Sequence, residues 1–126
     1  MRHAAEKDST ASVNYRRGVT SLAILALLRQ QDMYGYQMVQ EMARQSEGNL
    51  TTQEGSLYPV LYKLSDAGYV SERKVQSGKR QVRNYYHLEP SGEKYLERLI
   101  RDYTAVTGSV FRIINGDAAA DAGSKS

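Results

Sequence analysis

LTTQEGSLYPVLYKLSDAG, residues 50–68, is the stretch that decides the fold of this chain. Leu57, Leu61 and Leu64 recur in it at intervals of four and three, which places them on one face of a helix. Gly68 follows at a position where a left-handed residue commonly ends a helix. The stretch therefore predicts one amphipathic helix, with its leucines on the apolar face.

The first half of this helix carries two further signals. Thr51 and Glu54 stand at the spacing of a capping box, in which each side chain satisfies a backbone N–H group left open at a helix start. Pro59 lies inside the helix, where a proline removes a donor and crowds the carbonyl four residues back, at a cost of about 3 kcal/mol in a regular interior. That carbonyl belongs to Gly55, which leaves room to bend. We expect an irregular or kinked first half and a regular second half.

The opposite face of this helix carries hydrogen-bonding side chains, only one of which is charged. They are Gln53, Ser56, Tyr58, Tyr62 and Lys63. An ordinary solvated face would be richer in lysine and glutamate. The composition of this face favours a surface that binds a partner, and the alternative is an ordinary amphipathic helix.

The whole chain, 126 residues with a net charge of +3, suits one small domain and favours a polyanionic partner only weakly. It has no cysteine, which excludes disulfides and thiolate metal sites. The longest apolar run, Leu22–Leu28, is far too short to span a bilayer and lacks the context of a cleavable signal, so we expect a soluble cytoplasmic protein. The small polar residues at 1–12 and 116–126 predict a disordered head and tail.

Two helices are expected before the central one. Residues 21–30, SLAILALLRQ, are apolar on all sides, and a domain this small can hardly cover such a helix completely. We therefore expect part of it to meet a second chain. After a loop at Gln31–Met33, residues 34–46 predict a second helix whose buried stripe is Tyr36, Val39 and Met42–Ala43. Three helices with short links satisfy the helix-turn-helix pattern.

The pattern changes to a β-hairpin after the central helix. Tyr69–Arg73 and Asn84–Leu88 are rich in strand-forming residues, and Ser77–Gly78 supplies a turn between them. The residues expected to face the core are Val70, Tyr86 and Leu88, whereas Tyr85 and His87 are expected to face away.

The hairpin also gathers five cations, with no acidic residue between the first and the last. They are Arg73, Lys74, Lys79, Arg80 and Arg83. A solvated hairpin would normally mix its charges. The single sign favours a loop that contacts phosphates or enters a groove of nucleic acid, and the alternative is a hairpin whose charges serve solubility alone.

The last helix is expected to begin at Pro90, in the first turn, where a proline is tolerated. Apolar residues then alternate spacings of three and four, which is an a/d heptad seam and is typical of a helix that pairs with another helix. We predict a homodimer in which this seam and the first apolar helix form the interface. The interface residues are Leu22, Leu25, Leu96, Leu99, Tyr103, Val106, Val110 and Ile113.

No pattern in the sequence indicates catalysis or a bound metal. His3 and His87 lie far apart and, without cysteine, form no ligand cluster of recognisable spacing. Ser56 has no histidine at a suggestive spacing, and phosphate-binding loops and dinucleotide fingerprints are missing. We expect neither an enzyme nor a cofactor.

Three blocks of the sequence support a resemblance to a known family. They are YGYQMVQEM at 34–42, EGSLYPVLYKLSDAGYV at 54–70 and, after the basic turn, NYYHLEPSGEKYL at 84–96. In this order they resemble the PadR family of bacterial transcriptional regulators. The resemblance implies a homodimeric winged helix-turn-helix repressor, with the third helix in the major groove and the hairpin as the wing. The single C-terminal helix resembles the shorter form of the family, which has a reduced dimerisation arm.

The expected fold is therefore α+β, mainly α with a small β-hairpin. It comprises a winged helix-turn-helix DNA-binding domain at 13–89 and a C-terminal dimerisation helix at 90–115. The expected function is repression through a pseudo-palindromic operator in double-stranded DNA, and the alternative is a winged-helix protein-interaction module that does not read DNA. The residues expected to contact DNA are Tyr36, Gln53, Ser56, Tyr58, Pro59, Tyr62, Lys63, Lys79, Arg80 and Arg83.

In some PadR relatives the dimer interface also holds a small aromatic or drug-like effector. Tyr103 places a bulky ring in the heptad seam, where it would pack poorly against its symmetry mate, and a gap there would suit a small aromatic or amphipathic ligand. The residues expected around this ligand are Tyr15, Leu22, Ile100 and Tyr103. The alternative is that they simply fill the dimer core.

Overall fold

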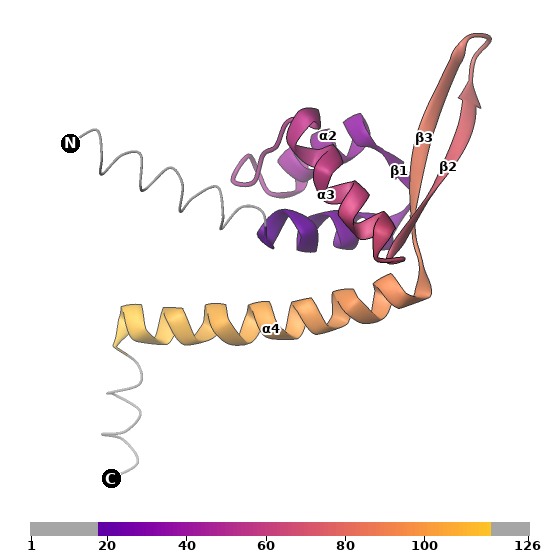
Figure 1. Ribbon diagram of the computed structural model, residues 1–126. Coiled ribbons are helices and arrows are strands. Elements are labelled where there is room, and N and C mark those ends of the chain that lie inside the picture. The colour runs from indigo at the N-terminus through magenta and orange to yellow at the C-terminus, as the bar shows by residue number, and fades with distance from the viewer. Residues whose placement is uncertain (1–17, 117–126) are drawn as a thin grey trace, which may run out of the picture. The chain divides into compact units, whose positions relative to one another are not determined.

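The computed structural model describes residues 18–116 (Figure 1). In chain order the elements are a helix that includes residues 18–30, β1 (Met33–Tyr34), α2 (Gly35–Gln45), α3 (Glu54–Asp66), β2 (Val70–Ser77), β3 (Gln81–Leu88) and α4 (Pro90–Asn115). The chain divides into two units, Met1–Leu96 and Glu97–Ser126, so α4 belongs to both. The predicted class, mainly α with a small sheet, is confirmed. The predictions made for residues 1–12, Tyr15 and 117–126 lie outside the described residues.

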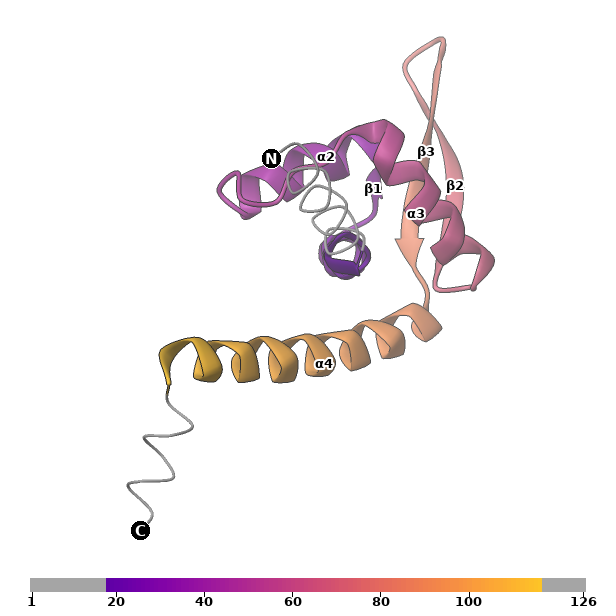
Figure 2. The same ribbon diagram turned by 60° about the vertical axis from the view of Figure 1, so that its left-hand side comes forward.

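The sheet is antiparallel, with the strand order β1-β3-β2. In the hairpin the register runs from Val70 opposite Leu88 to Ser77 opposite Gln81, and residues 78–80 form the loop. Both strands are longer than predicted. β1 pairs only with the base of β3, so the hairpin continues well past it in both views (Figure 1 and Figure 2). β1 was not predicted: Met33 was expected in a loop and Tyr34 in the second helix, because two residues are too short to show the alternation of a strand.

The core lies where the helices meet the base of the sheet. Its largest fully buried side chains come from every element of the first unit except β2: Ile24, Leu25, Met33, Met38, Leu57, Leu61, Tyr86 and Leu96. The predicted apolar face of α3 is confirmed, since its three leucines are all buried. Val70 and Tyr86 face the core as predicted, and His87 is exposed.

The predicted stripe of α2 is confirmed at Met42, half-buried at Val39 and Ala43, and wrong at Tyr36. Tyr36 is 51% exposed, whereas Met38 and Met42 are buried together with Gly35. The inward face of α2 is therefore set by a glycine and two methionines. Apolar residues of α2 also flank this buried face, so helical periodicity alone did not distinguish the buried apolar residues from the exposed ones.

The helix at residues 18–30 is covered mainly by its own chain. Ile24, Leu25, Leu27 and Leu28 are buried within the monomer. A half-buried stripe of apolar residues remains, at Val19, Leu22, Ala23 and Ala26. These positions recur at helical spacing and form one continuous face. Only this face, and not the whole helix, is available to a second chain.

The two ends of α3 differ in how well they were predicted. The capping box is wrong, because α3 begins at Glu54 with Gln53 as its N-cap and no side chain caps it. The Glu54 carboxylate instead accepts a hydrogen bond from the Tyr58 hydroxyl at 3.2 Å. The C-terminal end is confirmed: Gly68 has φ +82°, and the N–H groups of residues 68 and 69 bond to the carbonyls of Ser65 and Leu64. This is a Schellman motif. α3 is one helix across Pro59.

The first turn of α4 is fixed to this corner of the chain. Gly92 is buried against the Tyr69 carbonyl, which also accepts a hydrogen bond from the Glu89 N–H at 3.0 Å. The Ser91 hydroxyl donates to the Gly68 carbonyl at 2.7 Å. The Tyr69 and Tyr95 rings stack with their centroids 4.2 Å apart. The end of α3 and the start of α4 therefore form one packed joint.

Candidate nucleic-acid interface

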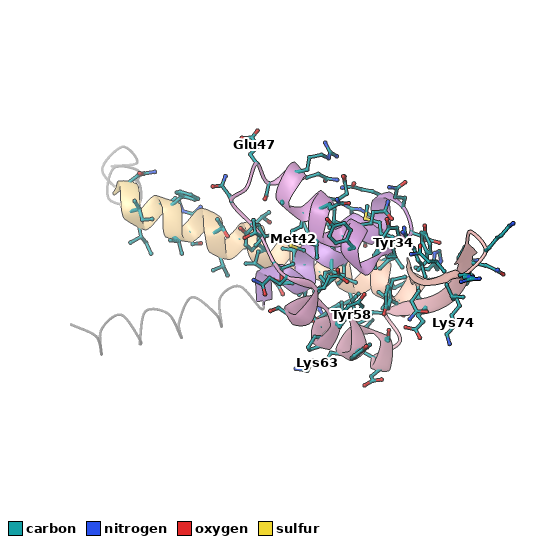
Figure 3. The ribbon with its side chains drawn as sticks, turned by 90° about the horizontal axis from the view of Figure 1, so that it is seen from above. Tyr34, Met42, Glu47, Tyr58, Lys63 and Lys74 are labelled. Carbon is teal, nitrogen blue, oxygen red and sulfur yellow. The ribbon has the colours of Figure 1, made fainter. Side chains whose placement is uncertain are left out.

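The exposed face of α3 carries most of the side chains predicted to contact DNA. Gln53, Ser56, Pro59 and Lys63 are exposed, and the Tyr62 ring is 56% exposed. The buried leucines on the opposite face of α3 hold the helix against the core and direct these side chains to solvent. Figure 3 shows Lys63 and Tyr58 on this helix. Except for Tyr58, the predicted residues of α3 thus share an accessible surface.

Tyr58 differs from the other predicted residues because it is half-buried. Its ring packs on the backbone of Gly35, and a Cβ atom at position 35 would lie 2.5 Å from the hydroxyl oxygen. Burial, followed by the nearby Glu54 carboxylate, raises the pKa of Tyr58. The ring stacks with that of Tyr62 at a centroid distance of 6.1 Å. Tyr58 therefore supports Tyr62 and connects α2 to α3.

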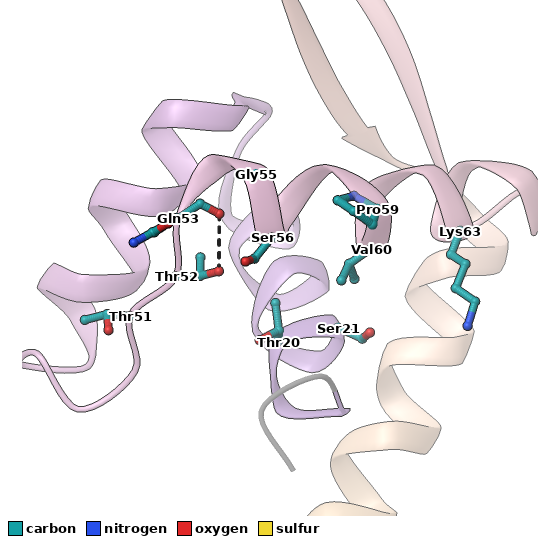
Figure 4. A pocket seen from close by; sticks show the side chains of 10 residues that line it. All are labelled: Thr20, Ser21, Thr51, Thr52, Gln53, Gly55, Ser56, Pro59, Val60 and Lys63. Carbon is teal, nitrogen blue, oxygen red and sulfur yellow. Dashed lines mark hydrogen bonds between the residues drawn. The ribbon is translucent and has the colours of Figure 1, made fainter. Parts of the chain in front are cut away.

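A pocket lies along one flank of α3 (Figure 4). Its lining residues are Thr20, Ser21, Thr51, Thr52, Gln53, Gly55, Ser56, Pro59, Val60 and Lys63. The lining is rich in hydroxyl groups and adjoins the start of α3, and it includes one cation. Neither Thr51 nor Thr20 was predicted as a site residue, because no local pattern connects residues about thirty positions apart in the chain.

Four of the five hairpin cations fall into two groups, according to whether an acidic side chain pairs with them. Lys74, Lys79 and Arg80 are exposed, and among the described residues no acid pairs with them. Arg73, in contrast, forms an ion pair with Asp32 at 3.0 Å. The same carboxylate lies 2.8 Å from Nδ1 of His87. The positive charge of the hairpin is therefore partly offset at its base by Asp32, the acidic residue that precedes β1.

Arg83 is held by an aromatic ring. Its guanidinium carbon lies 4.3 Å from the centroid of the Tyr34 ring, within the range of a cation–π interaction. The Tyr34 ring also meets that of Tyr85 edge to face, at 5.3 Å and 71°. Sequence reasoning missed Tyr34 and Asp32 as site residues. The only signal was that Tyr34 opens the YGY block and Asp32 shortly precedes it, which does not reveal a partner on the hairpin.

The residues predicted for the dimer interface separate into buried and accessible groups. Leu25 and Leu96 are fully buried within one chain, so they are core residues and cannot present a surface to a partner. Leu22, Leu99 and Ile100 are half-buried. The exposed members of the seam are Tyr103, Val106, Val110 and Ile113, and Phe111 and Ile114 beside them are also exposed. In the second unit α4 thus carries an exposed apolar face.

Two observations concern sites of other kinds. Within residues 18–116, no cluster of three or more histidine or acidic side chains is placed to hold a metal ion. None of the helices in that range is long and apolar enough to cross a membrane.

Comparison with known families identifies the chain. Residues 24–98, more than half of it, match the model of the transcriptional regulator PadR-like family. The chain belongs to this family. PadR-like proteins are transcriptional regulators, so the prediction that the chain is not an enzyme is confirmed.

Individual PadR-like relatives agree with this assignment. The chain is 30% identical over 78 residues to the negative transcriptional regulator PadR of Bacillus subtilis, covering 62% of this chain and 43% of that protein. It is 29% identical over 83 residues to the transcriptional regulator YqjI of Escherichia coli, covering 66% of this chain and 38% of that protein. The match spans less than half the length of these two relatives.

Two solved structures show the same fold. A PadR family regulator from Eggerthella lenta superposes with a TM-score of 0.73 at 21% identity, over 90% of this chain and 97% of that one. Bacillus subtilis PadR in complex with operator DNA superposes with a TM-score of 0.61 at 28% identity, over 65% of this chain and 47% of that one.

The structure gives a physical reason for the PadR-like sequence blocks. The YGY block contacts the LYP block where Gly35 packs under Tyr58. The AGYV block contacts the LEPSG block where Gly92 packs on Tyr69. Each glycine allows a close approach that a Cβ atom would prevent. The blocks that resemble the family are therefore pairs of segments in direct contact.

Proposed function

We propose that this PadR-like protein is a sequence-specific DNA-binding repressor that acts as a homodimer on a pseudo-palindromic operator. One observation carries the proposal. The exposed polar face of α3 and the unpaired cations of the β2–β3 hairpin belong to the same compact unit, which is the arrangement of a recognition helix and a wing.

In this proposal α3 enters the major groove and its side chains read base edges. Gln53, Tyr62 and Lys63 supply donors and acceptors of the kind that distinguish base pairs there. Lys79 and Arg80 at the hairpin tip contact phosphates, which adds affinity through the release of counterions. The hydroxyl-rich pocket beside α3 supplies further donors for the DNA backbone. The solved complex of Bacillus subtilis PadR with operator DNA supports this assignment.

The second part of the proposal is the dimer. Two half-sites about 34–36 Å apart require two recognition helices related by a two-fold axis. The exposed apolar face of α4 is the surface proposed to bind a second copy of this chain, because its residues keep the heptad spacing at Tyr103, Val106, Val110 and Ile113. The half-buried stripe around Leu22 adds to the interface.

An effector site is the third part. A small aromatic or amphipathic compound bound between the protomers beside Leu22, Ile100 and Tyr103 would release the protein from DNA. Such a ligand acts only through different affinities for the DNA-competent and the incompetent dimer. Binding must therefore lower operator affinity, and the operator must lower ligand affinity equally. Titration with phenolic acids, flavonoids and planar cationic dyes tests this, with Tyr103→Ala as the control.

The DNA-binding proposal is tested by titrating the purified protein with a duplex selected from random sequences and with an unrelated duplex. The logarithm of the affinity should fall with the logarithm of salt concentration by about 0.9 per phosphate contact. Arg80→Ala should weaken both duplexes alike and reduce the slope by about one contact. Lys63→Gln should instead weaken the selected duplex more. Absence of salt-sensitive binding to any duplex would favour a winged-helix protein-interaction module. A reporter gene behind the selected operator, repressed when the protein is present, tests the direction of control.

A further inference from the structure

Two arginines on the same face of the hairpin are held in different ways. Cross-strand pairing places Arg73 opposite Tyr85 and Arg83 opposite Val75, so both arginines share the face on which Tyr34 lies opposite Tyr85. The charge of Arg73 is offset by the Asp32 carboxylate at 3.0 Å. Arg83 contacts an uncharged ring instead. Of these two contacts, only the one at Arg83 leaves the positive charge of the arginine without an acidic partner.

The position of Tyr34 explains why Arg83 reaches it. β1 ends at Tyr34, directly opposite Tyr85, and Arg83 lies two residues further along β3 toward the hairpin loop. Such diagonal neighbours on one sheet face lie within reach of aromatic and long side chains. Beyond Tyr34, no strand within residues 18–116 covers this edge of β3. The guanidinium therefore rests on the ring at the point where β1 ends. Figure 3 shows Tyr34 beside the hairpin.

The chemistry of this contact matters for an anion. A cation–π contact pairs the guanidinium with no hydrogen-bond acceptor, so the N–H donors that face away from the ring remain available. Among the described residues no acceptor forms an ion pair or hydrogen bond with Arg83. The side chain is half-buried, so its conformational freedom is already reduced before a partner arrives. Preorganisation of this kind lowers the entropic cost of binding.

We propose that Tyr34 is a positioning residue of the DNA interface, which holds the Arg83 guanidinium with its N–H edges open to a phosphate of the DNA backbone. This inference rests on the proposed function, in which the hairpin is the wing. Asp32, two residues before Tyr34, has the opposite effect: it withdraws the charge of Arg73 from the interface. The short segment before α2 thus determines which of these two arginines, Arg73 or Arg83, is free to meet DNA.

A double-mutant cycle in the full chain tests the role of Tyr34. Binding of a short random-sequence duplex is measured for the wild type, Tyr34→Leu, Arg83→Gln and the double variant over a range of salt concentrations. Arg83→Gln should reduce the salt slope by about 0.9, the value of one phosphate contact. Tyr34→Leu should weaken binding about two- to five-fold, the usual size of an exposed cation–π contact, and should have no effect when Arg83 is already glutamine.

Two matched variants separate this role from a general effect on folding. Tyr34→Phe keeps the ring and should bind DNA like the wild type, whereas Arg73→Gln should leave the salt slope close to that of the wild type. In the free protein, the NMR signal of the Arg83 Nε–H group should show a ring-current shift that is retained in Tyr34→Phe and lost in Tyr34→Leu.

Three results would overturn the proposal. Tyr34→Leu could leave wild-type binding unchanged, it could weaken binding equally in both Arg83 backgrounds, or Tyr34→Phe could bind as poorly as Tyr34→Leu. A wild-type protein without salt-dependent binding would overturn the proposed function and this role with it, even if the ring-current shift were present. The shift therefore distinguishes a missing stack from a missing DNA contact.

Discussion

The Tyr58 hydroxyl lies directly against the backbone of Gly35, so a Cβ atom at position 35 would be 2.5 Å from the hydroxyl oxygen and 2.9 Å from the ring carbon that bears it. This contact joins the start of α2 to the middle of α3. The Tyr62 ring, on the exposed face of α3, stacks with that of Tyr58. The geometry of the proposed recognition surface thus depends on a residue that has no side chain.

Gly35→Ala is expected to destabilise the fold by about 1–3 kcal/mol, because an added methyl group must displace a packed ring. Urea unfolding measures the change. Gly55→Ala is the matched control. Position 55 is helical, and an added Cβ atom meets nothing within 4 Å. That control should gain about 0.5–1 kcal/mol. Equal stability of the Gly35→Ala variant and the wild type would show that the Tyr58 ring moves aside freely.

Glu47→Gly is expected to stabilise the protein. Glu47 follows α2 with φ +55°, a left-handed conformation that costs a non-glycine residue about 1–2 kcal/mol. Glycine removes this cost but adds freedom to the unfolded chain, so the net gain should be up to about 1 kcal/mol. Thermal and urea unfolding measure it, and Glu47→Ala should give no gain. A loss of stability on Glu47→Gly would contradict the prediction.

Stability is expected to fall at alkaline pH through Tyr86. Burial, followed by the hydrogen bond with Glu72, raises the pKa of Tyr86 well above its ordinary value. A raised pKa in the folded state means that this contribution is complete below about pH 10, the unfolded value, and is lost as the pH rises further. Urea unfolding between about pH 8 and 11 should show the decrease, and Tyr86→Phe should show a smaller one. A flat profile for the wild type would count against this role.

Val106→Glu is expected to separate the proposed dimer. Val106 is 64% exposed in the single chain, so the change should leave the folding of each chain intact. A glutamate in the seam would instead bury an unpaired charge on association. Sedimentation should report a monomer with reduced operator affinity. Thr104→Glu adds the same charge at an exposed position outside the seam and should remain dimeric. A dimeric Val106→Glu protein would place the interface elsewhere.

Periodicity predicted the parts of the fold that repeat along one element. The leucine face of α3 and the end of that helix at Gly68 followed from spacing and from the conformational freedom of glycine. The start of α3 was wrong because Thr51 and Glu54 satisfy the spacing of a capping box without its hydrogen bonds. The spacing of two residues shows that their side chains could cap a helix, but it does not show where the helical backbone begins.

The contacts that define the candidate interface join residues far apart in the chain. Asp32 and Arg73 are forty-one positions apart, and the sequence around each residue gives no indication that it contacts the other. Tyr34 meets Arg83 only because β1 pairs with the base of β3. The sequence therefore named candidate side chains for the site, but not which of their charges are paired within the fold.

The register of the hairpin also limits how its length can change. Side chains alternate between the two faces of a strand, so one residue inserted between Arg83 and Tyr85 would turn Arg83 to the face opposite Tyr34. Residues added in the loop at 78–80 lie beyond Arg83 and leave its contact with Tyr34 in place. The hairpin can therefore be lengthened or shortened by engineering at its loop. The register of β3 from Arg83 to Tyr85 has to stay unchanged in every such variant.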